Sequence, residues 1–325
     1  DAWLNKSETI ATLAKGESKT FIYTYKVVGA DAGKTLKNTV IAKADNLPEE
    51  KGDTAETKIK KNDPVKPVGP SKPQLNKADH YAYIVGYPDG LVHPEKNITR
   101  AEVATIFFRM LQDESREDFW AQENWFFDVM PTDWFNNAVS TLANANLING
   151  YPDGNYRPNA NITRAEFATI AIRFFLEEDV EITENNLSDV KGHWAEANID
   201  LAYALNLING YPDGTFRPDQ QITRAEAMTI VNRVLERAPH KDHLLDDMIE
   251  WPDNMDEDIW YYADVQEATN SHEFYKTKDK DEDKAHEIWT ELLPVRDWVA
   301  LEQAWSAANS SKNPGEVVDI KINTP

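Results

Sequence analysis

The 325-residue chain contains no cysteine, which excludes disulfide frameworks, cysteine-based metal sites and thiol nucleophiles. It also lacks any apolar run close to the roughly 18 residues that a membrane helix needs. Basic residues are scarce, because 34 Lys and Arg face 56 Asp and Glu, for a net charge of −22. Phosphate backbones are bound by clustered Lys and Arg, so this balance argues against a nucleic-acid partner.

The residues that are present can build a core. Apolar residues make up 41% of the chain and include ten tryptophans, which is enough for a packed interior in most of it. The acidic excess indicates a well-solvated surface, and the absence of cysteine suits an exported protein. The chain begins at Asp1 with neither Met nor a signal peptide, so we expect a processed protein or a piece of a longer one.

Two short motifs each occur three times at fixed spacing. Gly-Tyr-Pro-Asp-Gly stands at 86–90, 150–154 and 210–214, so that successive copies begin 64 and then 60 residues apart. Ile-Thr-Arg-Ala-Glu follows eight residues after each copy, at 98–102, 162–166 and 222–226. Such self-similarity indicates an array of one supersecondary unit.

Each motif predicts a local structure. In the first, Pro presets φ at the second position of a turn and Gly closes it, whereas the alternating acidic residues of a calcium loop are missing. In the second, Thr and Glu form a capping box that begins a helix. Apolar residues then recur at helical spacing and are expected to face the core: Val103, Ile106, Phe107, Met110, Phe167, Ile170, Ala171, Phe174, Ala227, Ile230, Val231 and Val234.

A second helix is expected before turns two and three, opened by Trp134 and Trp194. The first unit has no such helix, but Trp260 opens an extra one that no turn follows. Because a repeat unit cannot bury its apolar face alone, we predict that the Trp260 helix completes the first unit. The three units would then close into a pseudo-threefold ring.

We therefore predict a mainly α fold with a small N-terminal β segment. Helix-turn-helix repeats would occupy 76–276, at about 76–115, 124–180 and 186–240, with a closing helix over 257–272. Residues 1–62, with strands expected at 20–27, 38–42 and 54–59, resemble part of an immunoglobulin-like stalk module, and 63–75 form a Pro-rich linker. The tail over 277–325 is expected to hold one or two helices around 289–305 and an edge strand at 317–322.

Arginine occupies the first position of all three predicted repeat helices, where the helix dipole disfavours a cation: Arg100, Arg164 and Arg224. A guanidinium beside the free N–H groups of a helix start can hold a carboxylate or a phosphate. Alternatively, each arginine pairs with a turn carboxylate, from Asp89, Asp153 or Asp213. The residue types leave both interpretations open.

The tryptophans that open the second helices also have two interpretations, a core residue or a half-exposed platform for a sugar face. An aspartate precedes each of Trp134, Trp194 and Trp260, namely Asp128, Asp189 and Asp253.

The whole pattern resembles the S-layer homology domain, whose usual arrangement is three tandem copies. The matching features are the aspartate, the Trp helix, the glycine-rich turn with Tyr156-Arg157-Pro158 or Phe216-Arg217-Pro218 after it, and the capping motif. The resemblance covers about residues 76–275 and implies a three-pronged pseudo-trimer that anchors exported proteins non-covalently to the bacterial cell wall. Its implied ligand is a secondary cell-wall polysaccharide, anionic and pyruvylated, held in grooves between repeats.

The resemblance also implies carbohydrate-binding positions: Arg100, Arg164, Arg224, Trp134, Trp194, Trp260, Asp128, Asp189, Asp253, Gly150, Tyr151, Gly210 and Tyr211. The first unit departs from the pattern with Val92-His93-Pro94, so the groove between units two and three matches best. No cofactor and no metal are implied. The expected location is extracellular, at the bacterial cell surface or wall, and self-association in a surface layer is compatible with it.

Two other functions stay open, a structural subunit of an S-layer lattice and a non-catalytic part of a glycoside-active surface enzyme. No carboxylate pair is singled out for glycoside hydrolysis, and neither a serine elbow nor a phosphate loop is present. The seven histidines are scattered, and His240-Lys241-Asp242-His243 lacks a metal-ligand context. We therefore expect that the chain is not an enzyme.

Overall fold

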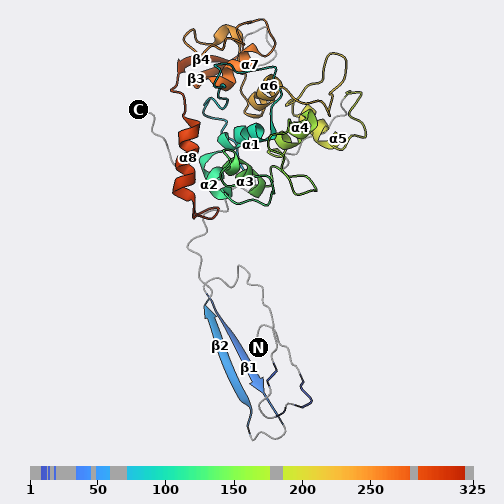
Figure 1. The fold of residues 1–325 in the computed structure, drawn as a ribbon, viewed down its shortest axis with the longest axis vertical. Helices are drawn as coiled ribbons and strands as arrows, with labels where there is room; N and C mark the ends of the chain where they lie inside the picture. The colour runs from blue at the N-terminus through green and yellow to red at the C-terminus, as the bar shows by residue number, and fades with distance from the viewer. Residues whose placement is uncertain are drawn as a thin grey trace. The chain divides into compact units, whose positions relative to one another are not determined.

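The computed structural model describes residues 9–12, 14, 18–19, 34–44, 49–58, 72–175, 186–278 and 285–318. The chain divides into two compact units, Asp1–Val68 and Gly69–Pro325 (Figure 1). In the first unit, β1 (Thr35–Ala42) pairs antiparallel with β2 (Lys51–Lys58). The strand expected at 20–27 and most of the Pro-rich linker lie outside the described residues, so the immunoglobulin-like module stays a prediction.

The second unit is mainly helical. Its helices are α1 (Arg100–Arg109), α2 (Asp113–Phe119), α3 (Asn136–Asn144), α4 (Arg164–Ile172), α5 (Glu196–Ala204), α6 (Arg224–Val234), the short 3-10 helix η2 (Lys241–His243), α7 (Tyr262–Thr269) and α8 (Trp298–Asn309). Strand β3 (His272–Thr277) pairs antiparallel with β4 (His286–Leu292). The mainly α fold class is thus confirmed. In the described part of the chain, none of the helices combines the length and apolar character needed to span a bilayer.

The capping motifs begin α1, α4 and α6 as predicted. In each case the Thr side chain accepts a hydrogen bond from the backbone N–H of Glu three residues later, and the Glu side chain accepts one from the Thr backbone. These reciprocal bonds satisfy two donors that a helix start otherwise leaves free. The arginines therefore occupy the first helical position.

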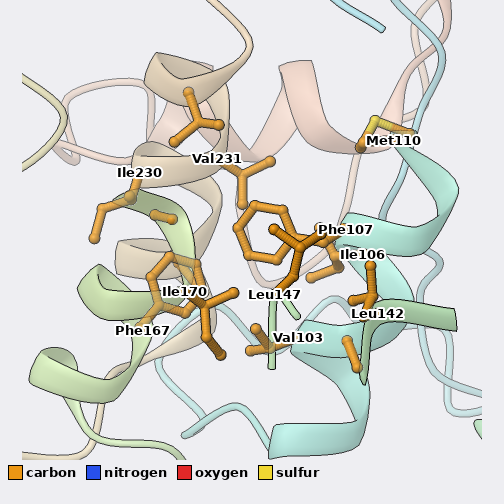
Figure 2. Close-up of a cluster of buried hydrophobic side chains, with 14 of the residues drawn as sticks. Val103, Ile106, Phe107, Met110, Leu142, Leu147, Phe167, Ile170, Ile230 and Val231 are labelled. Carbon is orange, nitrogen blue, oxygen red and sulfur yellow. The ribbon is translucent and has the colours of Figure 1, made fainter. Parts of the chain in front are cut away.

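The apolar faces of these helices meet in one core (Figure 2). Every apolar position predicted to face the core is buried. Phe107 of α1 stands at the contact with the second repeat, where its ring centroid lies 5.9 Å from that of Phe167 and 5.2 Å from that of Phe174. Each large apolar side chain buried in this way contributes about 1.5–3 kcal/mol to stability.

Three isoleucines join the repeats in a closed cycle of backbone hydrogen bonds. The N–H of Ile98 donates to the carbonyl of Ile222 (3.2 Å), that of Ile222 to Ile162 (3.1 Å), and that of Ile162 back to Ile98 (3.1 Å). Because each capping motif donates to one neighbour and accepts from the other, the array is a pseudo-threefold ring and not an open solenoid.

Helix α7 completes the first unit, as predicted. The backbone N–H groups of Tyr83 and Ile84 both donate to the carbonyl of Ala268 in α7, at 3.0 Å. In the other two units the equivalent bonds run within one repeat, from Leu147 and Ile148 to Leu142 and from Leu207 and Ile208 to Ala202. A helix from the C-terminal side thus replaces the one that the first unit lacks.

The tail differs from the sequence prediction. Trp289, expected on a helix, lies on β4, and only the segment from Trp298 to Trp305 is helical, in α8. The strand pair β3–β4 and helix α2 were not predicted. Val317 and Val318 lie outside any strand, and the rest of the expected edge strand falls beyond the described residues. The helical spacing of the apolar residues placed Trp289 on a helix, but its pairing with strand β3 makes it part of a strand.

Candidate functional site

The three Gly-Tyr-Pro-Asp-Gly segments are tight turns. In each, the N–H of the last Gly donates to the Tyr carbonyl at 2.9 Å, and that glycine has φ near +80°, which a Cβ would strain. The first glycine is required by packing, because a Cβ on Gly150 would lie 2.5 Å from the ring of Phe126. The turns are therefore rigid corners held against the segment that precedes the Trp helix.

The aspartates before the Trp helices hold these corners in place. The two carboxylate oxygens of Asp128 accept hydrogen bonds from the backbone N–H groups of Tyr156 (2.7 Å) and Arg157 (2.8 Å). Asp189 binds Phe216 and Arg217 in the same way, and Asp253 binds Val92 and His93 of the first turn. Since both oxygens of each carboxylate are engaged, the geometry gives these residues a positioning task.

The arginines at the helix starts are buried, with Arg100 and Arg164 each 5% exposed and Arg224 3% exposed. Arg164 donates through Nε to the carbonyl of Phe216 (2.8 Å) and through Nη1 to Oε1 of Glu226 (2.7 Å). Arg100 and Arg224 repeat the arrangement with Glu166 and Glu102. Each arginine therefore joins its own helix start to the capping-box glutamate of the next repeat around the ring.

The alternative interpretation paired these arginines with the turn aspartates. An ion pair is present, but its carboxylate belongs to a capping-box glutamate. Asp153 instead pairs with Arg157 at 2.8 Å and Asp213 with Arg217 at 2.9 Å, each within its own turn. Hydrogen bonds from Arg157 lower the pKa of Asp153 to about 2. The local partner excludes the more distant one, because four residues along a turn place the two charges side by side.

A tyrosine completes each arginine–glutamate pair. The hydroxyl of Tyr87 donates to Oε1 of Glu102 at 2.6 Å, and Tyr151 and Tyr211 do the same to their glutamates. Burial and this hydrogen bond raise the pKa of Tyr87 to about 12. Burial opposes ionisation of Glu102, but the bonds from Tyr87 and Thr99 and the charge of Arg224 outweigh it and lower its pKa. At neutral pH the glutamate is therefore ionised and the tyrosine neutral.

A cavity of about 460 Å³ opens beside the third turn. Arg164, Gly210, Tyr211, Arg233 and Trp260 contribute to its wall, together with the apolar Ile208 and Ile230. The sequence places equivalent residues beside turn two, where Gly150 and Tyr151 lie next to Arg100, and beside turn one. We call this cavity the third-turn groove and, by analogy, call the equivalent residue sets beside the other two turns the second-turn and first-turn grooves.

The tryptophans that open the second helices are exposed, by 60% for Trp134, 63% for Trp194 and 62% for Trp260. Of the two interpretations left open for them, a core residue is therefore wrong. Helices α3, α5 and α7 begin two residues after them, and the next residues, Phe135, Ala195 and Tyr261, take the buried positions instead. An exposed indole ring on a rigid helix start offers an apolar face and a polar edge, as sugar binding requires.

Sequence reasoning missed a second set of arginines. Arg233 in the third-turn groove donates to the carbonyl of Leu207 (3.4 Å), and Arg173 donates to that of Leu147 (2.6 Å). Neither forms an ion pair within 4.0 Å among the residues that the structure describes, and burial lowers the pKa of both, although the charge of Asp264 opposes this effect at Arg233. The signal was present, because an Arg stands nine residues after each helix-start Arg, at 109, 173 and 233.

The first-turn groove differs in one respect. Arg109, the equivalent of Arg173 and Arg233, donates through Nε to Oε1 of Glu302 in α8 at 2.8 Å. The ring of Trp298, also in α8, lies 5.6 Å from the same guanidinium. The C-terminal helix therefore neutralises the cation that the other two grooves leave unpaired.

The third-turn groove is suited to bind an anion. Arg164 has an Nη2 group with no hydrogen-bond partner in the described part of the chain, and Arg233 adds a second guanidinium. The one carboxylate in the wall, Glu226, is already bound to Arg164 and Tyr211. A hydrolytic pair needs two carboxylates across the bond to be cleaved, and this wall supplies none that is free.

The repeats also match known proteins in sequence. A model of the S-layer homology domain matches residues 65–104, 126–168 and 186–228. The "Cellulosome-anchoring protein" of Acetivibrio thermocellus is 36% identical over 220 residues, which is 66% of this chain and 47% of that protein. "Cell surface glycoprotein 1" of the same organism is 36% identical over 214 residues, covering 62% of this chain and 9% of the glycoprotein.

An "Exoglucanase XynX" from Acetivibrio thermocellus is 34% identical over 162 residues, covering 48% of this chain and 14% of the enzyme. The chain thus spans less than half the length of these curated relatives. The match to the exoglucanase falls within the repeat region. The chain therefore carries three S-layer homology domains.

Proposed function

We propose that the chain anchors an exported protein to the bacterial cell wall by binding an anionic, pyruvylated secondary cell-wall polysaccharide. The third-turn groove supports this most directly, because unpaired Arg233 stands in one cavity with exposed Trp260. The chain has a net charge of −22, so most of its surface repels anions. An arginine with no carboxylate within ion-pair distance therefore marks a place where an anion can bind.

The ligand chemistry follows from the groups in the wall. A pyruvyl ketal carries one carboxylate on a sugar ring, and a guanidinium binds a carboxylate with paired, charge-assisted hydrogen bonds. The exposed face of Trp260 would stack on the apolar face of the same sugar. Arg164, anchored through Nε and Nη1, would supply its remaining Nη2 group without having to reorganise.

The remaining predicted residues would either hold the turns in place or line the other two grooves. Asp128, Asp189 and Asp253 would fix the turns, and Gly150, Tyr151, Gly210 and Tyr211 would present the turn backbone to the ligand. Arg100 and Trp194 would serve the second-turn groove with Arg173. In the first-turn groove, Arg224 and Trp134 would have no free second arginine, because Glu302 binds Arg109.

The names of the relatives support an extracellular, non-catalytic role at the cell surface. The exoglucanase shares with this chain a segment that makes up 14% of the enzyme, and that segment corresponds to the repeats. Its catalytic activity therefore lies outside what is shared, and we infer that this chain is not an enzyme.

The test is sedimentation of the purified chain with cell-wall sacculi, before and after removal of the secondary polymer by mild acid. We expect co-sedimentation with intact sacculi and its loss with stripped ones. Arg233→Gln should weaken binding, whereas the control Arg157→Gln, in an exposed arginine already paired with Asp153, should not. Equal binding to stripped and intact sacculi would exclude the polysaccharide and favour self-association in a surface lattice.

A further inference from the structure

Four side chains with metal-ligand chemistry meet in the interior, away from the grooves. His80 precedes the first turn, Glu267 lies on α7, His272 begins β3 and Glu287 lies on β4 (Figure 1). They are 2%, 0%, 1% and 0% exposed, and their ligand atoms all lie within 4.8 Å of one another. Two ionisable carboxylates are seldom buried this completely unless they are paired or bind a cation.

The separations between these atoms match those around a small cation. His80 Nδ1 lies 3.1 Å from Glu267 Oε1, 3.2 Å from His272 Nε2 and 3.6 Å from Glu287 Oε2. His272 Nε2 lies 3.3 Å from Glu267 Oε2. Ligands about 2.0–2.1 Å from a tetrahedral zinc ion are about 3.3–3.4 Å from each other. The distances from His80 Nδ1 to His272 Nε2 and to Glu287 Oε2, and from His272 Nε2 to Glu267 Oε2, are close to this value, and the whole group lies within 4.8 Å.

In three of the four side chains, one polar atom forms a hydrogen bond with the surrounding protein, and the other polar atom faces the cluster. His272 Nδ1 lies 3.1 Å from the carbonyl of Asn270, so it carries the proton and Nε2 presents a lone pair to the cluster. Oε1 of Glu267 accepts from Arg237 (3.3 Å), and Oε1 of Glu287 accepts from the N–H of Ala238 (2.9 Å).

Two of the inward atoms lack hydrogen-bond partners of their own, whereas His80 Nδ1 and His272 Nε2 lie within hydrogen-bond distance of each other at 3.2 Å. Oε2 of Glu267 and Oε2 of Glu287 are buried and accept no hydrogen bond from the described residues. The lone pair of His272 Nε2 faces Oε2 of Glu267 at 3.3 Å, an arrangement that repels unless a cation or a proton lies between the two atoms. Such pairs of outer hydrogen bond and inward lone pair are the usual surroundings of metal ligands in proteins.

We propose that His80, Glu267, His272 and Glu287 bind one divalent transition-metal ion of the zinc class. Imidazole nitrogen with carboxylate oxygen suits zinc among the common ions, whereas calcium and magnesium prefer oxygen alone. All four ligands come from the protein, which is typical of a structural site and not of a catalytic one. Arg237 and Lys276 contact the outer oxygens of the glutamates, Oε1 of each, and leave Oε2 of each for the ion.

The ion would fasten the closure of the ring. His80 comes from the start of the repeat array, and the other three ligands come from the segment that closes it, more than 180 residues later. The backbone N–H of His272 already donates to the carbonyl of His80 at 3.1 Å, so the two segments are adjacent. The sequence predicted no metal site because its ligands follow no local spacing, and this inference departs from that expectation.

The experiment uses the full 325-residue chain, stripped with a chelator and titrated with zinc chloride alone. We expect one equivalent of tightly bound zinc and a rise in melting temperature of roughly 5–10 °C at zinc far above the dissociation constant. Cobalt substitution should give the intense visible absorption of a four-coordinate ion. X-ray absorption at the zinc edge should show two imidazoles. Absence of a bound equivalent, or a six-coordinate cobalt spectrum, would overturn the proposal without any variant.

Two variants locate the ion. Glu287→Gln keeps an acceptor for the N–H of Ala238, and His272→Gln keeps a polar side chain, so each tests the ligand with least damage to the fold. Either should weaken zinc binding by more than about 100-fold, while circular dichroism of the metal-free variants stays as in the parent chain.

The matched control is His243→Gln. His243 stacks on His286 at 4.8 Å in a separate, partly exposed histidine group, and its loss should leave zinc binding unchanged. Loss of zinc in His243→Gln but not in His272→Gln would place the ion at that other group and refute the assignment. Because the control lies in the same unit, a general loss of stability cannot imitate this pattern.

Discussion

Arg109 and Glu302 form an ion pair at 2.8 Å that Arg173 and Arg233 do not have anywhere in the described ranges. Three arginines at one position of a pseudo-threefold ring are thus chemically unequal, because α8 packs beside only one of them. The ring symmetry alone would suggest three equivalent grooves. The ion pair reduces the number with an unpaired second arginine to two.

The first prediction concerns the number of ligands bound. A pyruvylated saccharide fragment should bind two equivalents per chain in calorimetry, and Arg173→Gln or Arg233→Gln should each leave one. Loss of a charge-assisted bond of about 1.5–3 kcal/mol weakens a single groove by roughly tenfold or more. Arg109→Gln should still bind two equivalents but should lower the free energy of unfolding by about 2–4 kcal/mol, because it leaves Glu302 unpaired. Three equivalents in the parent chain would contradict this assignment.

The second prediction separates binding from stability at the tryptophans. Trp260→Ala should abolish saccharide binding in the third-turn groove, yet change the free energy of unfolding by no more than about 0.5 kcal/mol, because the side chain is 62% exposed. Trp194→Ala should do the same for the second-turn groove.

The matched control is Trp305→Ala in α8, which is 2% exposed and should cost about 3–5 kcal/mol of stability. Denaturant unfolding and calorimetry measure the two effects. Normal saccharide binding by Trp260→Ala would remove the platform role.

The sequence predicted those features that local chemistry decides. Pro and Gly fix the turns, Thr and Glu fix the helix starts, and helical spacing marks the buried faces of α1, α4 and α6. Ring closure was also predictable, because the Trp260 helix repeats the offsets of its relatives and the first unit lacks a helix to cover it. The turns, the helix starts and the buried faces need only residues near one another in the chain, whereas ring closure was inferred from the repeat pattern as a whole.

Long-range partners decided the rest. Arg164 pairs with Glu226, which is 62 residues away, while its candidate partner Asp153 pairs with Arg157 only four residues away. No spacing rule distinguishes these outcomes before the ring is assembled. Trp289 shows the same limit, since its spacing suits a helix but its pairing with β3 makes it part of a strand. The sequence therefore predicted the turns and helix starts that surround the candidate site, but it did not identify Arg233, the arginine without an ion pair.

The third prediction tests ring closure at Asp253. Asp253→Ala leaves the backbone N–H groups of Val92 and His93 without their acceptor, and should lower the free energy of unfolding by about 1–3 kcal/mol. Hydrogen exchange at these two amides should accelerate, although they lie 161 and 160 residues from the substitution. The control Asp247→Ala, in an exposed residue, should change neither quantity. Unchanged exchange at Val92 and His93 would show that Asp253 does not hold the first turn.

The fourth prediction concerns acid stability and Glu102. The folded protein lowers the pKa of Glu102, so its stabilising effect is fully present above the unfolded value near 4.5 and is lost as pH falls through the lower folded value. The free energy of unfolding of the parent chain should therefore decrease between pH 5 and pH 3. Glu102→Gln should decrease less steeply over that range, because its side chain takes up no proton. At pH 7 it should be less stable than the parent by about 1–3 kcal/mol, since Arg224 and Tyr87 lose a charged partner.

The control for Glu102 is Glu114→Gln at the exposed start of α2. Denaturant unfolding of the three proteins at half-unit pH steps gives the comparison. Glu114→Gln should run parallel to the parent chain, so that the difference in slope belongs to the buried arginine–glutamate pair and not to the removal of one negative charge. If Glu102→Gln also runs parallel to the parent, the ion pair between repeats contributes nothing to the acid sensitivity of the ring. The joint between the repeats would then rest on the isoleucine backbone cycle and the core around Phe107.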